Sequence, residues 1–308
     1  MNIVHQLLVR CLYLIPKQIV RLFAKRYIAG SNVDDAVNVI IKLNKMGIMA
    51  TVDILGEEIN TKQEAEVIVQ RYCDLLTIIH EQNLDSNVSI KPTHIGLKID
   101  KEFCYLNIRH IVEKAKLYGN FIRIDMEDHT CTTDTLNIFR NLRKEFDNVG
   151  IVLQSYLRRT LTDINTLLPE QPNIRLCKGI YLEPYNIAYK NGAIVNENFC
   201  YCLEKLLREH CYVGIATHDE KLVWHAIRLI DELQLNRMDY EFQMLLGVTE
   251  NLRKLILQAG HRLRVYVPFG EAWYAYSMRR FKENPNLAGY IIKNLLTRKY
   301  RDRNHATP

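Results

Sequence analysis

The sequence predicts an α/β fold, an eight-stranded (β/α)8 barrel. Two observations predict it: eight short apolar runs rich in β-branched and aromatic residues recur along the chain, and most of the stretches between them are long enough to hold a helix. Each run also stops at a polar residue. Because the catalytic groups of such barrels lie at the carboxyl ends of the strands, the pattern favours an enzyme.

The predicted strands follow one another from residue 50 to residue 269. In chain order they are ATVDI (50–54), VSIKP (88–92), FIRIDME (121–127), GIVLQSY (150–156), IRLCKGIY (174–181), VGIATH (213–218), YEFQML (240–245) and LRVYVPF (263–269). The polar residues at or near their carboxyl ends are Asp53, Lys91, Asp125, Gln154, Lys178, His218, Gln243 and Tyr266. Parallel strands of a barrel end at one mouth, so we expect these side chains to converge.

The residues before the first strand predict a helical arm. Between Val33 and Lys45, apolar and polar positions alternate at helical spacing, and Gly47 is placed to end that helix. No internal repeat, low-complexity segment or Gly/Ser linker follows. The sequence therefore predicts a helical arm at 1–48 and one barrel domain at 49–308 that ends in a basic helix.

Composition and charge argue against several other classes of protein. The eight cysteines form no CxxC pair, which argues against a zinc or disulfide framework and favours a reducing cytoplasm. The chain lacks an apolar run of the roughly 18 residues that a membrane span needs. Its net charge of +6 comes from basic ends, and the residues between them carry an excess of acids, so a nucleic-acid partner is not expected. The basic ends could instead contact an anionic membrane surface or be ordinary solvated helix faces.

Acidic residues cluster after the third apolar run. Asp125, Glu127 and Asp128 follow within four positions. Carboxylates at a strand end could supply a base, orient a cation or bind a metal. A solvated loop with ion pairs is the alternative.

The fifth and sixth runs carry candidate ligand-binding groups. Arg175, Lys178 and Gly179 combine two cations with a residue that permits close approach of the backbone, which suits a ligand rich in acceptor atoms. Thr217 and His218 end the next run, and either could hydrogen-bond a cofactor. A lone histidine is more often structural, and the absence of partner histidines argues against a metal site.

The last segment combines arginines with aromatic residues. Tyr276, Arg280 and Glu283 fall on one face of a predicted helix, and Arg279 flanks them. Two planar guanidinium groups match a small carboxylate, and Lys91 at the end of the second strand would be a third cation. A surface arginine pair within a basic tail is the alternative.

Eight segments of the chain, read in order, resemble the motifs of monofunctional proline dehydrogenases. They are SIKP, RIDME, VLQSYL, RLCKGIY, ATHD, YEFQML, VYVPFG and YSMRRFKEN, and they extend from about residue 50 to 290. The resemblance implies a distorted (β/α)8 barrel with its last helix above the mouth. It also implies that non-covalent FAD takes a hydride from C5 of L-proline, that the electrons pass to a membrane quinone, and that a separate dehydrogenase uses the product, Δ1-pyrroline-5-carboxylate.

The resemblance also implies a role for each matching residue. Catalytic roles fall to Asp125 and Arg175; proline contacts to Lys91, Tyr266, Tyr276, Arg279 and Arg280; and FAD contacts to Met126, Gln154, Arg175, Lys178, Gly179, Thr217, His218 and Glu283. No metal is implied. A cytoplasmic enzyme with a peripheral contact on the inner face of the membrane is expected, and Leu287, Ile291, Leu295 and Leu296 form one side of the helix expected to dock there.

Two positions depart from the family pattern, and other functions remain open. Ile180 and Leu182 stand where many relatives have alanine and tryptophan, and Ile180 could narrow the site. Tyr266 favours proline over 4-hydroxyproline, because relatives that prefer the latter tend to have a smaller residue there. The alternatives are a hydroxyproline dehydrogenase, another flavin barrel such as a methylenetetrahydrofolate-reductase-like enzyme, and an inactive barrel that acts as a binding protein.

Overall fold

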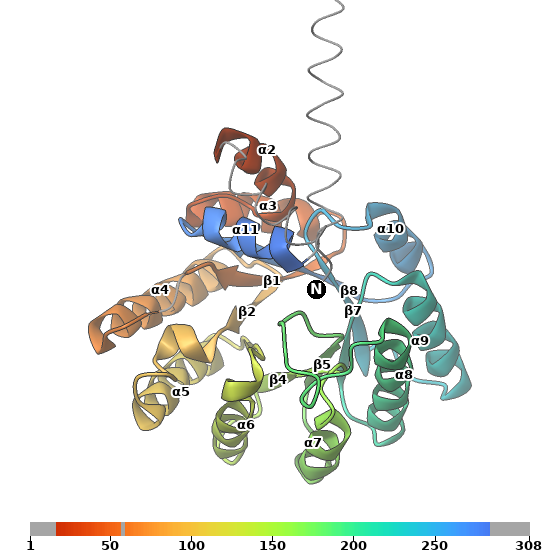
Figure 1. Ribbon diagram of the computed structural model, residues 1–308. Coiled ribbons are helices and arrows are strands. Elements are labelled where there is room, and N and C mark those ends of the chain that lie inside the picture. The colour runs from red at the N-terminus through yellow and green to blue at the C-terminus, as the bar shows by residue number, and fades with distance from the viewer. Residues whose placement is uncertain (1–16, 57–58, 284–308) are drawn as a thin grey trace, which may run out of the picture.

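The computed structural model describes residues 17–56 and 59–283, and these residues contain the predicted barrel. Eight parallel strands close in the order β1 to β8, and β8 pairs with β1 (Figure 1). They are β1 (Met49–Ile54), β2 (Ser86–Ile90), β3 (Ile122–Ile124), β4 (Val149–Gln154), β5 (Ile174–Cys177), β6 (Val213–Ala216), β7 (Tyr240–Leu245) and β8 (Leu263–Phe269). Each strand overlaps its predicted run, so the fold class is confirmed.

Helices connect the strands and surround the barrel (Figure 1). The α-helices are α2 (Lys17–Tyr27), α3 (Val33–Asn44), α4 (Lys62–Glu81), α5 (Lys101–Leu117), α6 (His129–Arg143), α7 (Thr160–Leu167), α8 (Gly192–Arg208), α9 (Glu220–Glu232), α10 (Glu250–Gln258) and α11 (Trp273–Glu283). Two short 3-10 helices, η1 (Pro92–Ile95) and η2 (Leu168–Glu170), complete the described part of the chain.

Side-chain caps explain where several helices begin. Thr61 and Glu64 form a capping box at the start of α4. Asp100, Asp128 and Asp219 accept backbone N–H bonds at the starts of α5, α6 and α9. Asp128, which the sequence placed in an acidic cluster, therefore has a structural task as the cap of α6.

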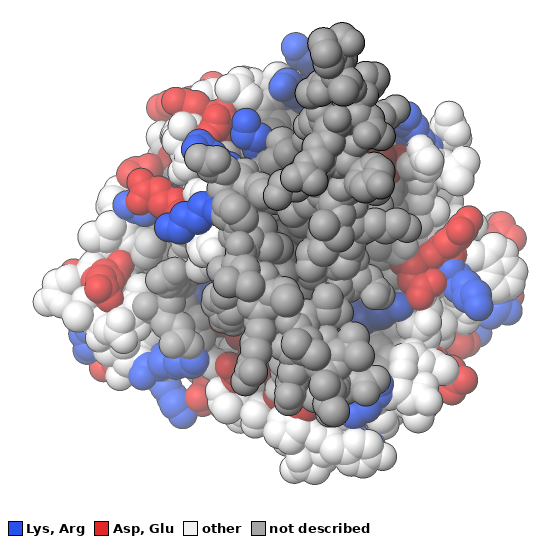
Figure 2. All heavy atoms as spheres, turned by 45° about the horizontal axis from the view of Figure 1, so that its top comes forward, with Lys and Arg blue, Asp and Glu red and all other residues white. Residues whose placement is uncertain are grey.

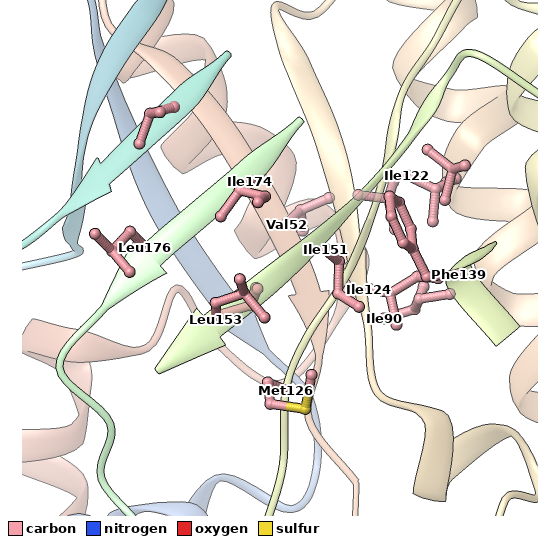
Figure 3. Close-up of a cluster of buried hydrophobic side chains, with 14 of the residues drawn as sticks. Val52, Ile90, Ile122, Ile124, Met126, Phe139, Ile151, Leu153, Ile174 and Leu176 are labelled. Atoms are coloured by element: carbon pink, nitrogen blue, oxygen red, sulfur yellow. The ribbon is translucent and has the colours of Figure 1, made fainter. Parts of the chain in front are cut away.

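The two faces of the strands differ in character. Aliphatic side chains such as Ile90, Ile124, Ile151 and Leu176 are fully or almost fully buried in one continuous core (Figure 3). The alternate positions bring polar side chains together across the sheet, as the hydrogen bond between Thr51 Oγ1 and Ser89 Oγ at 3.1 Å shows. The helices therefore pack on an apolar outer face, while polar groups enter the barrel.

The described part of the predicted arm packs in two places. Ala36, Ile40 and Leu43 of α3 belong to the main core. Ala24 in the last turn of α2 and Ile28 just after this helix form a small cluster with Leu55 and Tyr276. Hence α2 contacts α11.

Lys and Arg side chains are interspersed with Asp and Glu over the described surface that is visible in Figure 2.

Several predicted strands continue past the ends of those in the structure, and the difference is largest for β3 and β5. β3 ends at Ile124 and β5 at Cys177, whereas the apolar runs continue to residues 127 and 181. Gly179 has φ 102°, a left-handed conformation that turns the chain away from the sheet. The polar residues after these strands are therefore carried by loops at the barrel mouth.

Candidate active site

A cavity of about 540 Å³ opens at the carboxyl end of the barrel. It brings together every predicted site residue whose side chain the structure describes: Lys91, Asp125, Met126, Gln154, Arg175, Lys178, Gly179, Thr217, His218, Tyr266 and Tyr276. They come from most of the strand ends and from α11, positions far apart in sequence. Convergence at one mouth was expected from the parallel strands.

Lys91 is held at the cavity by Asp53, a strand-end residue that was expected at the barrel mouth but for which no role was predicted. Its Nζ donates a short hydrogen bond to Asp53, whose side chain is fully buried on β1. Tyr266 Oη lies 3.2 Å and Asp125 Oδ2 3.8 Å from the same nitrogen. Burial pulls the pKa of Lys91 down, but Asp53 and Asp125 outweigh it and raise that pKa above its ordinary value. Lys91 is therefore a fixed ammonium ion.

Asp125 links the two sides of the cavity floor. Its Oδ2 accepts a hydrogen bond from Tyr266 Oη at 2.8 Å, and its Oδ1 accepts one from Arg175 Nη1 at 2.8 Å. Burial, followed by the charges of Asp125 and Asp53, raises the pKa of Tyr266 well above that of a free tyrosine. Tyr266 thus stays a neutral donor. Both carboxylate oxygens of Asp125 are in use, so this residue orients its neighbours.

Arg175 is fixed along its whole guanidinium edge. Nε donates a short bond to Gln243 Oε1, and Nη2 donates to Ser89 Oγ at 3.1 Å. Its Cζ lies 5.4 Å from the centre of the Tyr266 ring. The side chain is 7% exposed. A buried, charged and rigid donor of this kind suits a negatively polarised ligand atom at the cavity edge.

Gln154, Met126 and Gly179 form a second wall of the cavity. Gln154 Nε2 donates to the backbone oxygen of Met126 at 3.4 Å, but its Oε1 is buried without a partner among the described residues. A Cβ at Gly179 would lie 2.1 Å from the Tyr156 ring. Glycine is therefore required at position 179, because its φ is positive and a side chain has no space there. The unpartnered Oε1 of Gln154 indicates a place where a ligand could donate a hydrogen bond.

Lys178, Thr217 and His218 line the third wall. Lys178 Nζ lies 2.8 Å from Asp219 Oδ2, and the Asp219 N–H donates to Thr217 Oγ1 at 3.1 Å. His218 Nε2 accepts the N–H of Leu245 at 2.8 Å. Burial, with smaller effects from Arg253 and Lys178, lowers the pKa of His218 to about 4. His218 is therefore a neutral imidazole that is anchored to the backbone at Leu245. It lines the cavity, and its Nδ1 is not used in the bond to Leu245.

The two other acids of the predicted cluster have different environments. Glu127 accepts bonds from the N–H and hydroxyl of Thr93 at 2.9 and 2.5 Å, and burial raises its pKa. Asp128 accepts the N–H of Thr130 at 2.9 Å. Within residues 17–56 and 59–283, no group of three His, Cys, Asp or Glu side chains could hold a metal ion. The three acids thus do not form one cluster.

The helix α11 carries the remaining predicted residues. Tyr276 is buried and lines the cavity. Arg279, Arg280 and Glu283 lie on the same helix, but their side chains are outside the described residues. Ile180 also lines the cavity, whereas Leu182 is 81% exposed.

Three residues of the site were not predicted as functional partners. Asp53 and Gln243 were recognised as strand-end residues, but nothing local indicated that they hold Lys91 and Arg175. Asp219 is the last residue of the ATHD motif, but no role was predicted for it; it both caps α9 and pairs with Lys178. Its cap position was a readable signal, while the other two depend on which strands are neighbours across the barrel.

Comparison with known proteins points to one family. A proline dehydrogenase family model matches residues 36–291. Proline dehydrogenase 1 of Bacillus subtilis subsp. natto is 36% identical over 276 residues, 90% of this chain and 91% of that protein. Proline dehydrogenase of Deinococcus radiodurans is 37% identical over 278 residues, 89% and 90% of the two chains.

A solved structure of proline utilization A (PutA) from Bdellovibrio bacteriovorus, inactivated by N-propargylglycine, matches with a TM-score of 0.79 and 27% identity. The match covers 85% of this chain and 33% of that one, so this chain spans about a third of the PutA protein. PutA of Bradyrhizobium japonicum, at 18% identity and a TM-score of 0.69, supports the fold alone.

Proposed function

This chain belongs to the proline dehydrogenase family, and from that premise we propose that it oxidises L-proline to Δ1-pyrroline-5-carboxylate. One observation carries the proposal: a buried network of Asp53, Lys91, Tyr266, Asp125 and Arg175 borders a single cavity at the carboxyl end of the barrel. The network places the ammonium of Lys91 beside the ring of Tyr266. A small cyclic amino acid could bind there with its carboxylate at the ammonium and its apolar ring against the tyrosine.

The proline carboxylate would bind the ammonium of Lys91. Asp53 and Asp125 keep Lys91 charged and in place, so this side chain loses little freedom when the ligand arrives. Arg279 and Arg280 of α11 are proposed as further carboxylate contacts. Tyr266 and Tyr276 would cover the pyrrolidine ring, and the two hydrogen bonds of Tyr266 keep its ring fixed. A fixed ring leaves little room for a 4-hydroxyl group, which favours proline.

The cavity also fits FAD held without a covalent bond. The orphaned Gln154 Oε1 could accept a hydrogen bond from a flavin ring, and Gly179 lets the backbone approach closely. We propose that FAD is held by Met126, Gln154, Arg175, Lys178, Gly179, Thr217 and His218, together with Glu283 of α11. When bound, FAD would supply the atom, N5, that accepts the hydride from proline C5.

The protein contributes orientation to this reaction. Lys91 and the α11 arginines would fix the carboxylate and thereby aim proline C5, while Arg175 and Asp125 keep the facing wall rigid. No described cavity residue is a ready base: Asp125 already accepts two bonds, and the pKa of His218 is about 4. The proton of the proline nitrogen would therefore leave to solvent.

We further propose a membrane quinone as the electron acceptor and a separate dehydrogenase as the user of the product. The described residues contain no helix long and apolar enough to cross a membrane. The basic, apolar terminal segment with Leu287, Ile291, Leu295 and Leu296 lies outside them. A peripheral contact of a cytoplasmic enzyme with the inner face of the membrane would bring the two partners together.

An exposed apolar loop beside the cavity supports such a contact. Leu182 and Tyr185 are 81% and 73% exposed, while Glu183 between them is buried and accepts the N–H of His129 at 2.9 Å. The loop is thus anchored while its apolar side chains face solvent, and Arg158 stacks on the Tyr185 ring at 4.9 Å. Apolar and cationic groups together favour an anionic lipid surface.

The loop can be tested with a matched pair of leucines. We expect Leu182→Ser to lower co-sedimentation with anionic vesicles and quinone-dependent turnover severalfold, with turnover on a soluble dye unchanged. Leu117, which is 79% exposed at the end of α5, directly precedes residues that line the separate cavity at the amino end of the barrel. Leu117→Ser should change neither quantity. Equal effects of both substitutions would remove the loop from the proposal.

Anaerobic flavin bleaching tests the reaction itself. Purified protein loaded with FAD should lose its visible flavin absorbance when L-proline is added, and should lose it far more slowly with 4-hydroxyproline. Bleaching by 4-hydroxyproline alone would make the enzyme a hydroxyproline dehydrogenase. Protein that stays colourless after FAD addition would support an inactive barrel and end the proposal.

A further inference from the structure

The interior of this barrel is polar over much of its length. Barrel interiors are usually filled by layers of branched aliphatic side chains. Here buried arginines come from three strands, Arg123 on β3, Arg175 on β5 and Arg264 on β8. Glu241 and Gln243 of β7 lie between the last two, 2% and 5% exposed. These two residues are i and i+2 on one strand, so they share its inner face.

A continuous chain of hydrogen bonds runs from the candidate active site to the amino end of the barrel. Asp125 accepts from Arg175 Nη1 at 2.8 Å, and Arg175 Nε donates to Gln243 Oε1. Gln243 Nε2 then donates to Glu241 Oε1 at 2.5 Å. Glu241 also accepts from Arg264 Nε and Nη2 at 2.7 and 3.0 Å. Four links thus join Asp125 to Arg264.

The charge of Glu241 decides which way the Gln243 amide points. Burial would raise the pKa of Glu241, but Arg264 and the hydrogen bonds of Arg264, Tyr212 and Gln243 lower it to about 2. A carboxylate only accepts hydrogen bonds, so Gln243 must turn its NH2 group toward it. The amide oxygen of Gln243 then faces Arg175 Nε, which requires an acceptor.

A glycine on the neighbouring strand makes room for this amide. A Cβ at Gly214 would lie 2.4 Å from Gln243 Nε2, closer than real Cβ contacts come. Any other residue at this position of β6 would push Gln243 away from Glu241. The Gly214 position therefore belongs to the same arrangement.

We propose that Glu241 is a positioning residue for Arg175 and acts through Gln243. Glu241 lines a separate cavity at the amino end of the barrel and does not line the mouth cavity, so it cannot touch substrate or cofactor there. By fixing the amide it fixes the acceptor of Arg175 Nε, and Nη1 and Nη2 are then directed to Asp125 and Ser89. The functional consequence rests on the proposed role of Arg175 beside FAD.

The first test replaces the carboxylate by its amide. In Glu241→Gln the side chain at 241 can donate as well as accept, so the Gln243 amide is no longer forced into one orientation. We expect at least a tenfold slower reduction of bound FAD by L-proline, with KM for proline changed less than threefold. In flavin-free protein, the NMR signal of the Arg175 Nε–H group should shift or broaden. Glu241→Asp, which keeps an acceptor, should recover part of both.

Tyr212→Phe is the matched control. Tyr212 Oη donates to Glu241 Oε2 at 2.8 Å, so the substitution removes a hydrogen bond from Glu241 but leaves Gln243 untouched. We expect a lower melting temperature with an unchanged Arg175 signal and an unchanged reduction rate. A rate loss in Tyr212→Phe as large as in Glu241→Gln would indicate general loosening and overturn the proposal.

Gly214→Ala provides a second route if Glu241→Gln does not fold. It displaces Gln243 while leaving the pair of Glu241 and Arg264 intact, and we expect the same loss of rate and the same change in the Arg175 signal. Unchanged rate and signal in this variant would contradict the proposal. If wild-type protein binds FAD but L-proline does not reduce it, the proposed function fails, whereas the Arg175 signal still tests the positioning.

Discussion

The two ends of the barrel hold cavities of similar size but different chemistry. The cavity at the amino end has about 470 Å³ and that at the carboxyl end about 540 Å³. At the amino end, Arg264 and Glu241 pair with each other, and Arg123 donates to the backbone oxygens of Ile151 and Asn173. Arg264 and Glu241 thus neutralise each other, whereas the Arg123 guanidinium is held by backbone oxygens and its Nε has no partner among the described residues.

At the carboxyl end, charged groups border a partly apolar space. Lys91 remains 17% exposed, and Met126, Tyr266 and Tyr276 form apolar walls beside it. Ligand sites are typically apolar with a few placed polar groups. The two cavities therefore differ little in volume, whereas the direction and partners of their charged side chains distinguish them. Glu241 and Gln243 connect the two ends.

The largest effect expected at the carboxyl end follows Lys91→Met. Losing this ammonium should reduce kcat/KM for proline by roughly 100- to 1,000-fold, the effect of removing one preorganised donor. It also leaves the fully buried Asp53 without its cation, which should lower the free energy of unfolding by about 3–5 kcal/mol. Steady-state kinetics and urea denaturation would measure both.

A paired change separates the two consequences. Asp53→Asn added to Lys91→Met removes the unpaired charge, so stability should recover while activity stays low. At the amino end, Arg123→Met should lower stability with little change in KM for proline. A large rise in KM from Arg123→Met would break the distinction between the ends.

Acid should destabilise the two ends in different pH ranges. The pKa of His218 is about 4 in the folded protein, against 6.5 for a free histidine, because burial and, to a smaller extent, the charges of Arg253 and Lys178 lower it. Between these values the unfolded chain binds a proton that the folded protein does not, so stability falls as pH falls, by at most about 3 kcal/mol. The pKa of Glu241 is about 2 in the folded protein, against 4.5 for a free glutamate. Its contribution to the free energy of unfolding is therefore lost only as the pH falls below 4.5.

His218→Gln tests the first of these ranges. Glutamine can still accept the Leu245 N–H but does not titrate. The variant should lose less stability than wild type between pH 6.5 and pH 5, and urea denaturation at both pH values would show it. Parallel losses in the two proteins would mean that another group controls this range.

The smallest effects should come from two glycines at opposite ends. A Cβ at Gly150 would lie 2.5 Å from Arg123 Nη1, and one at Gly179 2.1 Å from the Tyr156 ring. Gly150→Ala should cost about 1–3 kcal/mol of stability through overpacking and leave FAD affinity unchanged. Gly179→Ala should weaken FAD binding as well, which fluorescence titration would detect. Equal FAD affinities in both variants would place the flavin elsewhere.

Much of the fold could be predicted because each outward strand face is continuously apolar. The strand at YEFQML was predicted with its observed bounds, Tyr240–Leu245. Strand ends were harder to predict: β3 stops at Ile124, and the acids that follow it bond to Thr93 and to the start of α6. The apolar character of a segment does not reveal where its backbone pairing with the neighbouring strand ends.

The candidate site could be predicted where a motif is local and not where it depends on neighbours across the barrel. Lys178, Gly179, Thr217 and His218 stand together in short segments and do line the cavity. Asp53 and Lys91 are 38 positions apart, and their pairing follows from strand register. Such contacts arise only when adjacent strands are aligned, so no window of sequence contains them.

A crystal structure with a substrate analogue would show directly whether Lys91 binds the substrate carboxylate. The protein would be loaded with FAD and soaked with the proline analogue that has oxygen in place of the ring nitrogen, which cannot be oxidised in the same way. We predict that its carboxylate lies within ion-pair distance of Lys91 Nζ, with the ring against Tyr266. An analogue bound only in the amino-end cavity, or bound away from Lys91, would contradict the account.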